Sequence, residues 1–321
     1  MRRIVITRSL PEAGIASLRA AHDVQIYNVG PDTGGDENAV IEVAHEAEAL
    51  ISLLDNPITA HVLDNCPRLK IVAQCAVGYD NIDVEAAHAR EVVVTHTPGV
   101  LTEATADFAF ALLLGVARRL RAADQYVREG RFHRWETTTL LGMELAGKTL
   151  GIVGMGRIGA AVARRALGFG MKILYHNRHR ANPTIEHLYS AHFASFEDLL
   201  ARSDIITIHT PLNDQSHHLF NADVFRRMKP TALLVNTARG PIIDEAALVE
   251  ALAKGEIAGA GLDVYEREPT VHPGLFAQDR VLLAPHLGSA TVEARTAMAR
   301  MCSESILAVF NGASTVPYRI A

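Results

Sequence analysis

The feature that most constrains this chain is a glycine-rich turn, GIVGMGRIG at residues 151–159, which closes an apolar run and opens a helical pattern. Gly154 and Gly156 carry no side chain, so phosphate oxygens can approach the backbone amides of the turn. Gly159 lets the helix lie close to the strand before it. A second strand pattern follows at 173–176. This order of strand, turn, helix and strand predicts a dinucleotide-binding unit, with the pyrophosphate at the positive end of the helix.

Composition places the chain among globular enzymes of one large or two ordinary domains. It has 321 residues, of which 49% are hydrophobic and 21% charged, and a net charge of −5. Without a basic tail or cluster, nucleic acid is not expected as a partner. The longest apolar run, 108–117, is too short to span a bilayer. Three cysteines without pairing or metal spacing suit a reducing cytosol, so we expect a cytoplasmic protein without membrane or metal.

Short β-rich runs alternate with helical patterns along the whole chain. The first series of expected strands is 3–6, 24–27, 49–53, 70–73 and 92–96. The second series is 148–153, 172–176, 205–209, 232–237, 258–264 and 281–284. This alternation predicts an α/β protein with two doubly wound parallel sheets.

Between the two series we expect one long helix at about 103–131. Its middle, 108–116, is apolar on nearly every face, which predicts burial, between domains or between subunits. A final helix at 292–310 follows the second series. We therefore predict a dinucleotide-binding domain at 100–288 and a substrate-binding domain made of 1–99 plus 289–321, with a small-molecule site in the cleft between them.

The segment after the strand 172–176 bears on the choice of cofactor. Asn177 lies where an acidic residue would bind the ribose 2′-hydroxyl of NAD, and Arg178 and Arg180 follow it. A guanidinium can bind a 2′-phosphate, which a carboxylate would repel. We expect NADP(H) to be favoured over NAD(H). The alternative is that both arginines are solvated and that either cofactor is used.

Three polar residues stand at or just beyond the ends of expected strands: Arg239, Glu268 and His286. In an open parallel sheet, ligands bind beyond the carboxyl ends of the strands. A guanidinium can hold a carboxylate, a histidine can transfer a proton to or from a carbonyl, and a nearby carboxylate can orient that histidine. Taken singly, each of the three residues is compatible with a purely structural role, but together they predict a catalytic group.

With these motifs in place, the chain resembles the D-2-hydroxyacid dehydrogenases, and within them the glyoxylate/hydroxypyruvate reductases. The resemblance runs nearly the full length and rests on VGYDNID at 77–83, HTPG at 96–99 through TAD at 105–107, the glycine turn, HTPL at 209–212, NTARG at 236–240, GLDV at 261–264, EP at 268–269 and PHLGSA at 285–290. It implies a Rossmann cofactor domain inserted in a flavodoxin-like substrate domain.

The resemblance also implies roles for residues. Arg239, Glu268 and His286 would be catalytic: Arg239 would bind the substrate carboxylate and carbonyl, His286 would be the general acid in reduction, and Glu268 would keep its imidazolium charged. The substrate would also meet Leu53, Val77 and Gly78. The cofactor would be bound by Gly154, Met155, Gly156, Arg157, Ile158, Gly159, Asn177, Arg178, His209, Thr210, Pro211, Thr237, Ala238, Asp263 and Gly288.

The expected reaction is hydride transfer between NAD(P)H and a small 2-oxo acid, glyoxylate or hydroxypyruvate, to give the D-2-hydroxy acid. Related activities on formate, phosphite, phosphoglycerate or a bulkier 2-oxo acid stay open. A cofactor-sensing scaffold is a further alternative, disfavoured because all three catalytic residues are present. The resemblance implies a homodimer, and the apolar stretch 108–116 is consistent with one.

Overall fold

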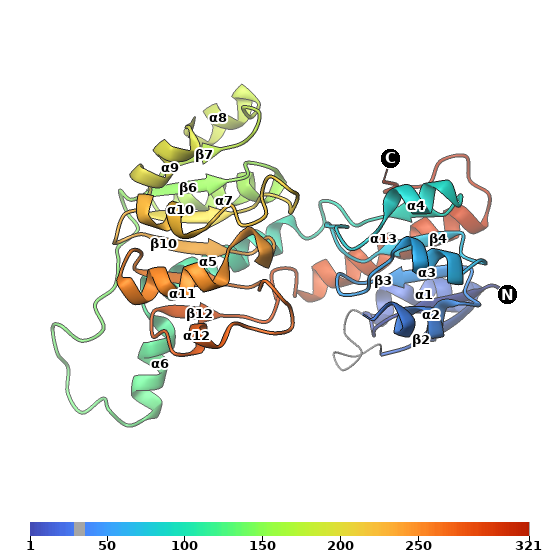
Figure 1. Cartoon of the computed structure of the whole chain (residues 1–321), viewed down its shortest axis with the longest axis horizontal. Coiled ribbons are helices and arrows are strands. Elements are labelled where there is room, and N and C mark those ends of the chain that lie inside the picture. Colours follow the sequence, from blue (N-terminus) through green and yellow to red (C-terminus); the bar gives the residue numbers. More distant parts are fainter. Residues whose placement is uncertain (29–35, 321) are drawn as a thin grey trace. The chain divides into compact units, whose positions relative to one another are not determined.

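The computed structural model describes residues 1–28 and 36–320. The chain divides into two compact units, one made of Met1–Leu101 and Ala290–Ala321 (unit 1) and one of Thr102–Ser289 (unit 2). Figure 1 shows that both ends of the chain belong to unit 1.

Unit 1 is built on a five-stranded parallel sheet with the order β2-β1-β3-β4-β5. Its strands are β1 (Arg3–Ile6), β2 (Asp23–Ile26), β3 (Ala49–Ser52), β4 (Ile71–Gln74) and β5 (Val93–Thr95). Its helices are α1 (Glu12–Ala21), α2 (Glu37–Ala44), α3 (Ala60–Asn65), α4 (Val84–Ala89) and α13 (Val292–Phe310). Every residue of β3 and β4 is buried, as expected for strands covered on both faces. This strand order is the flavodoxin-like one.

Unit 2 is built on a seven-stranded sheet with the order β12-β11-β10-β9-β6-β7-β8, and all its strand pairs are parallel. The strands are β6 (Thr149–Val153), β7 (Lys172–His176), β8 (Ala191–Phe193), β9 (Ile205–Ile208), β10 (Leu233–Asn236), β11 (Gly259–Leu262) and β12 (Val281–Leu283). The chain runs outward from β6 to β7 and β8 and then returns to β9 on the other side of β6. The strand order therefore reverses between β6 and β9, which is where ligands bind in such sheets.

The helices of unit 2 include the one that follows the glycine turn. They are α5 (Thr102–Ala117), α6 (Leu120–Arg128), α7 (Arg157–Gly168), α8 (Pro183–Tyr189), α9 (Phe196–Arg202), α10 (Ala222–Arg227), α11 (Glu245–Lys254) and α12 (Pro273–Phe276), with a 3₁₀ turn η2 (Gly240–Ile242). Local sequence sets several helix ends. The Asp244 side chain accepts a hydrogen bond from the amide of Ala247 at the start of α11, and Gly255 ends that helix at φ +70°.

The prediction of one helix over 103–131 is wrong. The helix breaks after Ala117, because Arg119 adopts a left-handed conformation with φ +52°, and α6 starts at Leu120. The apolar helix α5 is buried as expected, but inside unit 2, where it packs on α7, β10 and β11. Figure 1 shows α6 and the loop after it extending away from the sheet of unit 2.

The sequence also missed the edge strand β8. Its three residues, Ala-His-Phe, pair with β7, but only Ala191 is buried. A strand this short and exposed leaves no apolar run to detect. In the part of the chain that the structure describes, no helix combines the length and apolar character needed to cross a membrane.

Candidate active site

The three predicted catalytic residues follow three neighbouring strands of unit 2. Arg239 comes after β10, Glu268 after β11 and His286 after β12. The strand register pairs Asn236 with Leu262, and Leu262 with Leu283, so the three strands end side by side. Loops from one edge of a parallel sheet therefore carry all three side chains.

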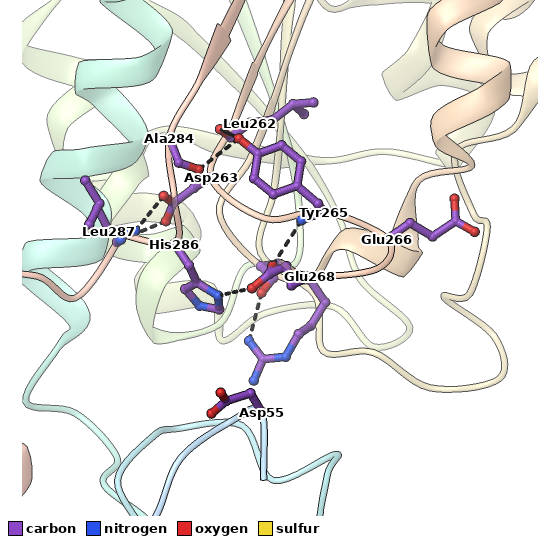
Figure 2. Close-up of polar contacts among 12 residues, drawn as sticks. Asp55, Leu262, Asp263, Tyr265, Glu266, Glu268, Ala284, His286 and Leu287 are labelled. Carbon is purple, nitrogen blue, oxygen red and sulfur yellow. Dashed lines mark hydrogen bonds and ion pairs between the residues drawn. The ribbon is translucent and has the colours of Figure 1, made fainter. Parts of the chain in front are cut away.

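His286 and Glu268 form a direct pair. The Nδ1 atom of His286 lies 2.8 Å from Oε2 of Glu268, while the other carboxylate oxygen accepts a hydrogen bond from the backbone amide of Tyr265 at 3.0 Å (Figure 2). The two side chains are 30% and 34% exposed. With Nδ1 engaged by the carboxylate, Nε2 is the ring nitrogen left to exchange a proton with a ligand.

Asp263 holds the backbone on which His286 sits. Its carboxylate oxygens accept hydrogen bonds from the amides of Leu287 at 2.6 Å and Gly288 at 2.7 Å, and its carbonyl accepts one from the amide of His286 at 2.8 Å (Figure 2). These bonds stabilise His286 at φ +56°, a left-handed conformation that non-glycine residues rarely adopt. Burial raises the pKa of Asp263, although the two amide bonds and the charge of His286 oppose that shift. Contact between Asp263 and a nicotinamide stays a prediction, and the residue already serves as a turn anchor.

Residues that sequence reasoning missed support the same loops. The hydroxyl of Tyr265 donates to the carbonyl of Ala284 at 2.9 Å, and burial raises the pKa of this phenol to about 12. Glu266 and Glu245 are bonded reciprocally, since each carboxylate accepts the backbone amide of the other residue at 2.7 and 3.2 Å. His218 lies 3.3 Å from the Glu266 carboxylate. These residues contact segments that are distant in the sequence, so no local motif identifies them.

Arg239 is brought next to the Glu268 loop by the glycine that follows it. A Cβ atom at Gly240 would lie 1.8 Å from the carbonyl carbon and oxygen of Tyr265, so only glycine permits this approach of the two backbones. The side-chain Nδ2 of Asn236 donates to the carbonyl of Arg239 at 2.9 Å and fixes the turn. Arg239 itself donates from Nη1 to the carbonyl of Ala238 at 2.8 Å.

The glycines of the turn after β6 have different structural reasons. Gly154 has φ +101°, and a Cβ there would lie 2.6 Å from the backbone of His209 and Thr210, across the point where the strand order reverses. A Cβ at Gly159 would lie 2.1 Å from the carbonyl of Gly154. At Gly156, φ is −84° and a Cβ would meet no atom of the described residues within 4 Å. The fold thus requires the first and third glycines, whereas the open space at Gly156 fits a bound phosphate.

The loops around this turn add polar groups. Asn177 accepts a hydrogen bond from the amide of Met155 at 2.6 Å, which ties the end of β7 to the turn. Thr237 has a buried hydroxyl that finds no hydrogen-bond partner in the described structure. Burial lowers the pKa of His209 to about 3, so its ring is neutral near pH 7 and lies 2.9 Å from the hydroxyl of Thr207. A dinucleotide fits this site, because no described residue fills the space beside Gly156 or forms a hydrogen bond with the hydroxyl of Thr237.

The two arginines after Asn177 differ. Arg180 forms two hydrogen bonds with the Glu186 carboxylate, at 2.8 and 2.9 Å. Arg178 is exposed and forms no hydrogen bond or ion pair with residues that the structure describes. The other predicted cofactor residues lie in the same loops: Arg157 and Ile158 begin α7, Thr210 and Pro211 follow β9, Ala238 follows β10 and Gly288 follows β12.

The predicted substrate residues outside unit 2 lie at strand ends of unit 1. Leu53 directly follows β3, and Val77 and Gly78 lie in the loop after β4, its neighbour in the sheet. The carbonyl of Val77 lies 2.9 Å from Nδ1 of His96, so a side chain from the end of β5 holds this loop. Leu53 and the backbone amides of Val77 and Gly78 thus form a second set of ligand candidates.

Comparison with known proteins gives a consistent result. Residues 110–288 match the model of the D-isomer specific 2-hydroxyacid dehydrogenase, NAD binding domain. A glyoxylate reductase of Thermococcus litoralis is 46% identical over 97% of this chain and 94% of its own length. A crystal structure of a Thermus thermophilus protein superposes with a TM-score of 0.91 at 42% identity, covering 99% of this chain and 100% of the other.

One further structure was solved with ligands. It is an NADPH-dependent glyoxylate/hydroxypyruvate reductase of Sinorhizobium meliloti in complex with NADP and malonate, similar at a TM-score of 0.88 and 34% identity, over 100% of this chain and 97% of that one.

Proposed function

Because the chain belongs to the D-isomer specific 2-hydroxyacid dehydrogenases, an enzyme family with a nicotinamide-binding domain, we propose that it reduces glyoxylate to glycolate and hydroxypyruvate to D-glycerate, preferably with NADPH. The single observation that carries this proposal is the His286–Glu268 pair beside the Arg239 loop, all at the carboxyl ends of three adjacent strands. Similarity to glyoxylate reductases over nearly the whole chain favours these substrates.

The cofactor would be held by the glycine turn and the loops that follow β7, β9 and β10. Phosphate oxygens would accept hydrogen bonds from the amides at the start of α7, where the helix dipole favours negative charge. When bound, the nicotinamide donates or accepts the hydride. The protein's own contribution is to orient the cofactor and the substrate and to manage one proton.

His286 would be the general acid of the reduction. Its Nδ1 is bonded to Glu268, so Nε2 would donate a proton to the substrate oxygen as negative charge develops there. Glu268, fixed by the amide of Tyr265, would hold the ring in the orientation needed for this transfer. In the oxidation direction the same Nε2 would accept the proton from the hydroxyl group.

Arg239 would bind the carboxylate and carbonyl oxygens that glyoxylate and hydroxypyruvate share. A planar guanidinium can donate two parallel hydrogen bonds to a carboxylate, which fixes its orientation. The backbone amides of Val77 and Gly78 would complete the carboxylate site, and Leu53 would contact the rest of the substrate. These assignments give binding to Arg239 and the two amides, and proton transfer to His286.

The preference for NADPH would come from Arg178. The sequence has no acidic residue directly after β7 to repel a 2′-phosphate, and the side chain of Asn177 accepts a hydrogen bond from the glycine turn. Arg180 is bonded to Glu186, whereas Arg178 is exposed beside the same loop. We therefore assign the 2′-phosphate to Arg178 rather than to Arg180.

The active form would be a homodimer in the cytoplasm. The apolar stretch 108–116 supports no dimer, because α5 is buried within unit 2. Several large apolar side chains that project from unit 2 lie together on α6 and the segment after it, namely Leu120, Val127, Phe132, Trp135 and Leu141, which are 55% to 78% exposed. A second copy of the chain would cover this surface.

A panel of acids assayed with each cofactor tests the proposal. Purified protein should oxidise NADPH with glyoxylate and hydroxypyruvate, with a higher kcat/KM than for pyruvate, formate or phosphite, and a higher one than with NADH. Preferred turnover of formate, phosphite, phosphoglycerate or a bulky 2-oxo acid would instead support a related dehydrogenase. Cofactor binding without turnover of any acid would support the scaffold.

A further inference from the structure

A row of polar side chains crosses the carboxyl ends of three adjacent strands in unit 1. Thr7 follows β1, Ser52 ends β3 and Gln74 ends β4, and all three are fully buried. Asn56, in the loop after β3, is 2% exposed. Buried polar groups destabilise a fold unless they are hydrogen-bonded, so this row exists in the core only because its members bond to one another.

Two amide side chains hold the backbone of Leu53 on both sides. The amide of Leu53 donates to Oδ1 of Asn56 at 2.9 Å, and Nδ2 of Asn81 donates to the carbonyl of Leu53 at 3.0 Å. Asn81 also donates to the carbonyl of Asn56 at 2.7 Å, and the hydroxyl of Thr7 donates to Oδ1 of Asn56 at 2.6 Å. Leu53 is therefore fixed by side chains from outside its own strand.

Gln74 connects this loop to the next one. Its Nε2 donates to Oδ1 of Asn81 at 2.8 Å and lies 3.4 Å from the carbonyl of Gly78. Its Oε1 accepts the hydroxyl of Ser52 at 2.6 Å. The Ser52 bond fixes the amide of Gln74 with its nitrogen toward Asn81 and Gly78. The loops after β3 and β4 are thus joined through one side chain.

We propose that Gln74, Asn81 and Asn56 are positioning residues that set the separation between Leu53 and the Val77–Gly78 turn and so select small 2-oxo acids. The inference rests on the proposed function, which places the substrate at these loops. None of the three residues needs to touch the substrate. Their hydrogen bonds act through the backbone of Leu53 and Gly78, the two residues that contact the substrate in the proposed function.

The variant Gln74→Met tests this assignment, because methionine has similar length and no amide. With NADPH saturating, KM for glyoxylate should rise about tenfold, as expected for loss of the bonds that hold a binding loop. The ratio of kcat/KM for 2-oxobutyrate to that for glyoxylate should rise several-fold, because the site widens. The Kd for NADPH, measured by fluorescence titration, should stay within twofold. An unchanged KM and an unchanged ratio would overturn the proposal.

Ser303→Ala is the matched control for a general loosening of unit 1. Ser303 is fully buried in α13 and donates to the carbonyls of Gly14 at 2.7 Å and Ala299 at 3.0 Å, without contacting either loop. This variant should lose thermal stability but keep the substrate ratio of the wild type. An equal change of ratio in Ser303→Ala would overturn the assignment, since it would show that any weakening of unit 1 has the same effect.

A second pair covers the case in which Gln74→Met does not fold. Thr7→Val removes one hydroxyl while keeping the shape, and Thr7→Ser keeps the hydroxyl that donates to Asn56. KM for glyoxylate should rise about threefold in the valine variant and return toward the wild-type value in the serine variant. Equal KM values in both would contradict the network. Failure of the wild type to reduce any 2-oxo acid would instead defeat the proposed function itself, so the two failures are distinct.

Discussion

His286 depends on two carboxylates that act on different parts of it. Glu268 bonds to its ring, and Asp263 bonds to the backbone of the next two residues. The first interaction sets the orientation of the imidazole ring, and the second sets the position of the backbone that carries it. Because Asp263 is buried and Glu268 is partly exposed, changes at the two residues should have different consequences.

Glu268→Gln should lower kcat of the reduction about tenfold, because the Glu268 carboxylate holds the imidazole of His286 in the orientation needed for proton transfer. The Kd for NADPH should not change. Glu266→Gln is the matched control, since that carboxylate bonds to His218 and the Glu245 amide. A kcat of Glu268→Gln equal to that of the wild type would remove Glu268 from this role.

Arg178→Asp should reverse the cofactor preference. A carboxylate there would repel the 2′-phosphate, so kcat/KM with NADPH should fall at least tenfold while that with NADH changes little. Arg180→Gln provides the comparison, because Arg180 is bonded to Glu186 and should leave the NADPH/NADH ratio near that of the wild type. A changed NADPH/NADH ratio in Arg180→Gln, with an unchanged ratio in Arg178→Asp, would show that Arg180 and not Arg178 binds the 2′-phosphate.

Among the elements, the glycine turn after β6 contains two kinds of glycine. The fold requires Gly154 and Gly159, whereas a bound ligand would require Gly156. The backbone of unit 2 occupies the space beside Gly154 and Gly159, whereas no residue that the structure describes fills the space beside Gly156. The GxGxxG spacing identified the turn from sequence, but it could not tell these cases apart. Only the positions of neighbouring strands show which glycine faces open space.

Gly156→Ala should therefore weaken cofactor binding without destabilising the protein. Its backbone conformation suits alanine, and the new Cβ would meet no atom in the described part of the chain, but the added methyl group would displace a pyrophosphate. KM for NADPH should rise about tenfold or more at an unchanged Tm. Gly168→Ala, at another glycine with open space, should change neither quantity. A wild-type KM in Gly156→Ala would place the phosphates elsewhere.

Sequence periodicity was sufficient for most strands because parallel strands buried on both faces are continuous apolar runs. It failed where that signal was absent: β8 has one buried residue, and the break at Arg119 involves neither glycine nor proline. The catalytic candidates were found because each follows a strand. Gln74 and Tyr265 were missed because their partners come from other loops, and pairings between distant segments leave no mark in local sequence.

At the scale of the whole molecule, the apolar surface on α6 and residues 129–141 predicts association. Wild-type protein should elute as a dimer in size-exclusion chromatography with light scattering, and Phe132→Ser/Trp135→Ser should shift it toward the monomer, because large exposed apolar side chains favour burial in an interface. Phe276→Ser, which changes an exposed phenylalanine on α12, should remain dimeric. A dimer that survives the double substitution would show that subunits meet on another surface.

Proton transfer by His286 at the edge of the unit 2 sheet can be tested with the variant His286→Gln. We would measure kcat for glyoxylate reduction with NADPH saturating, together with the Kd for NADPH. We expect kcat to fall by about 10²- to 10⁴-fold, the usual contribution of a general acid, while Kd stays within about twofold. Turnover close to the wild-type value would show that another group donates the proton.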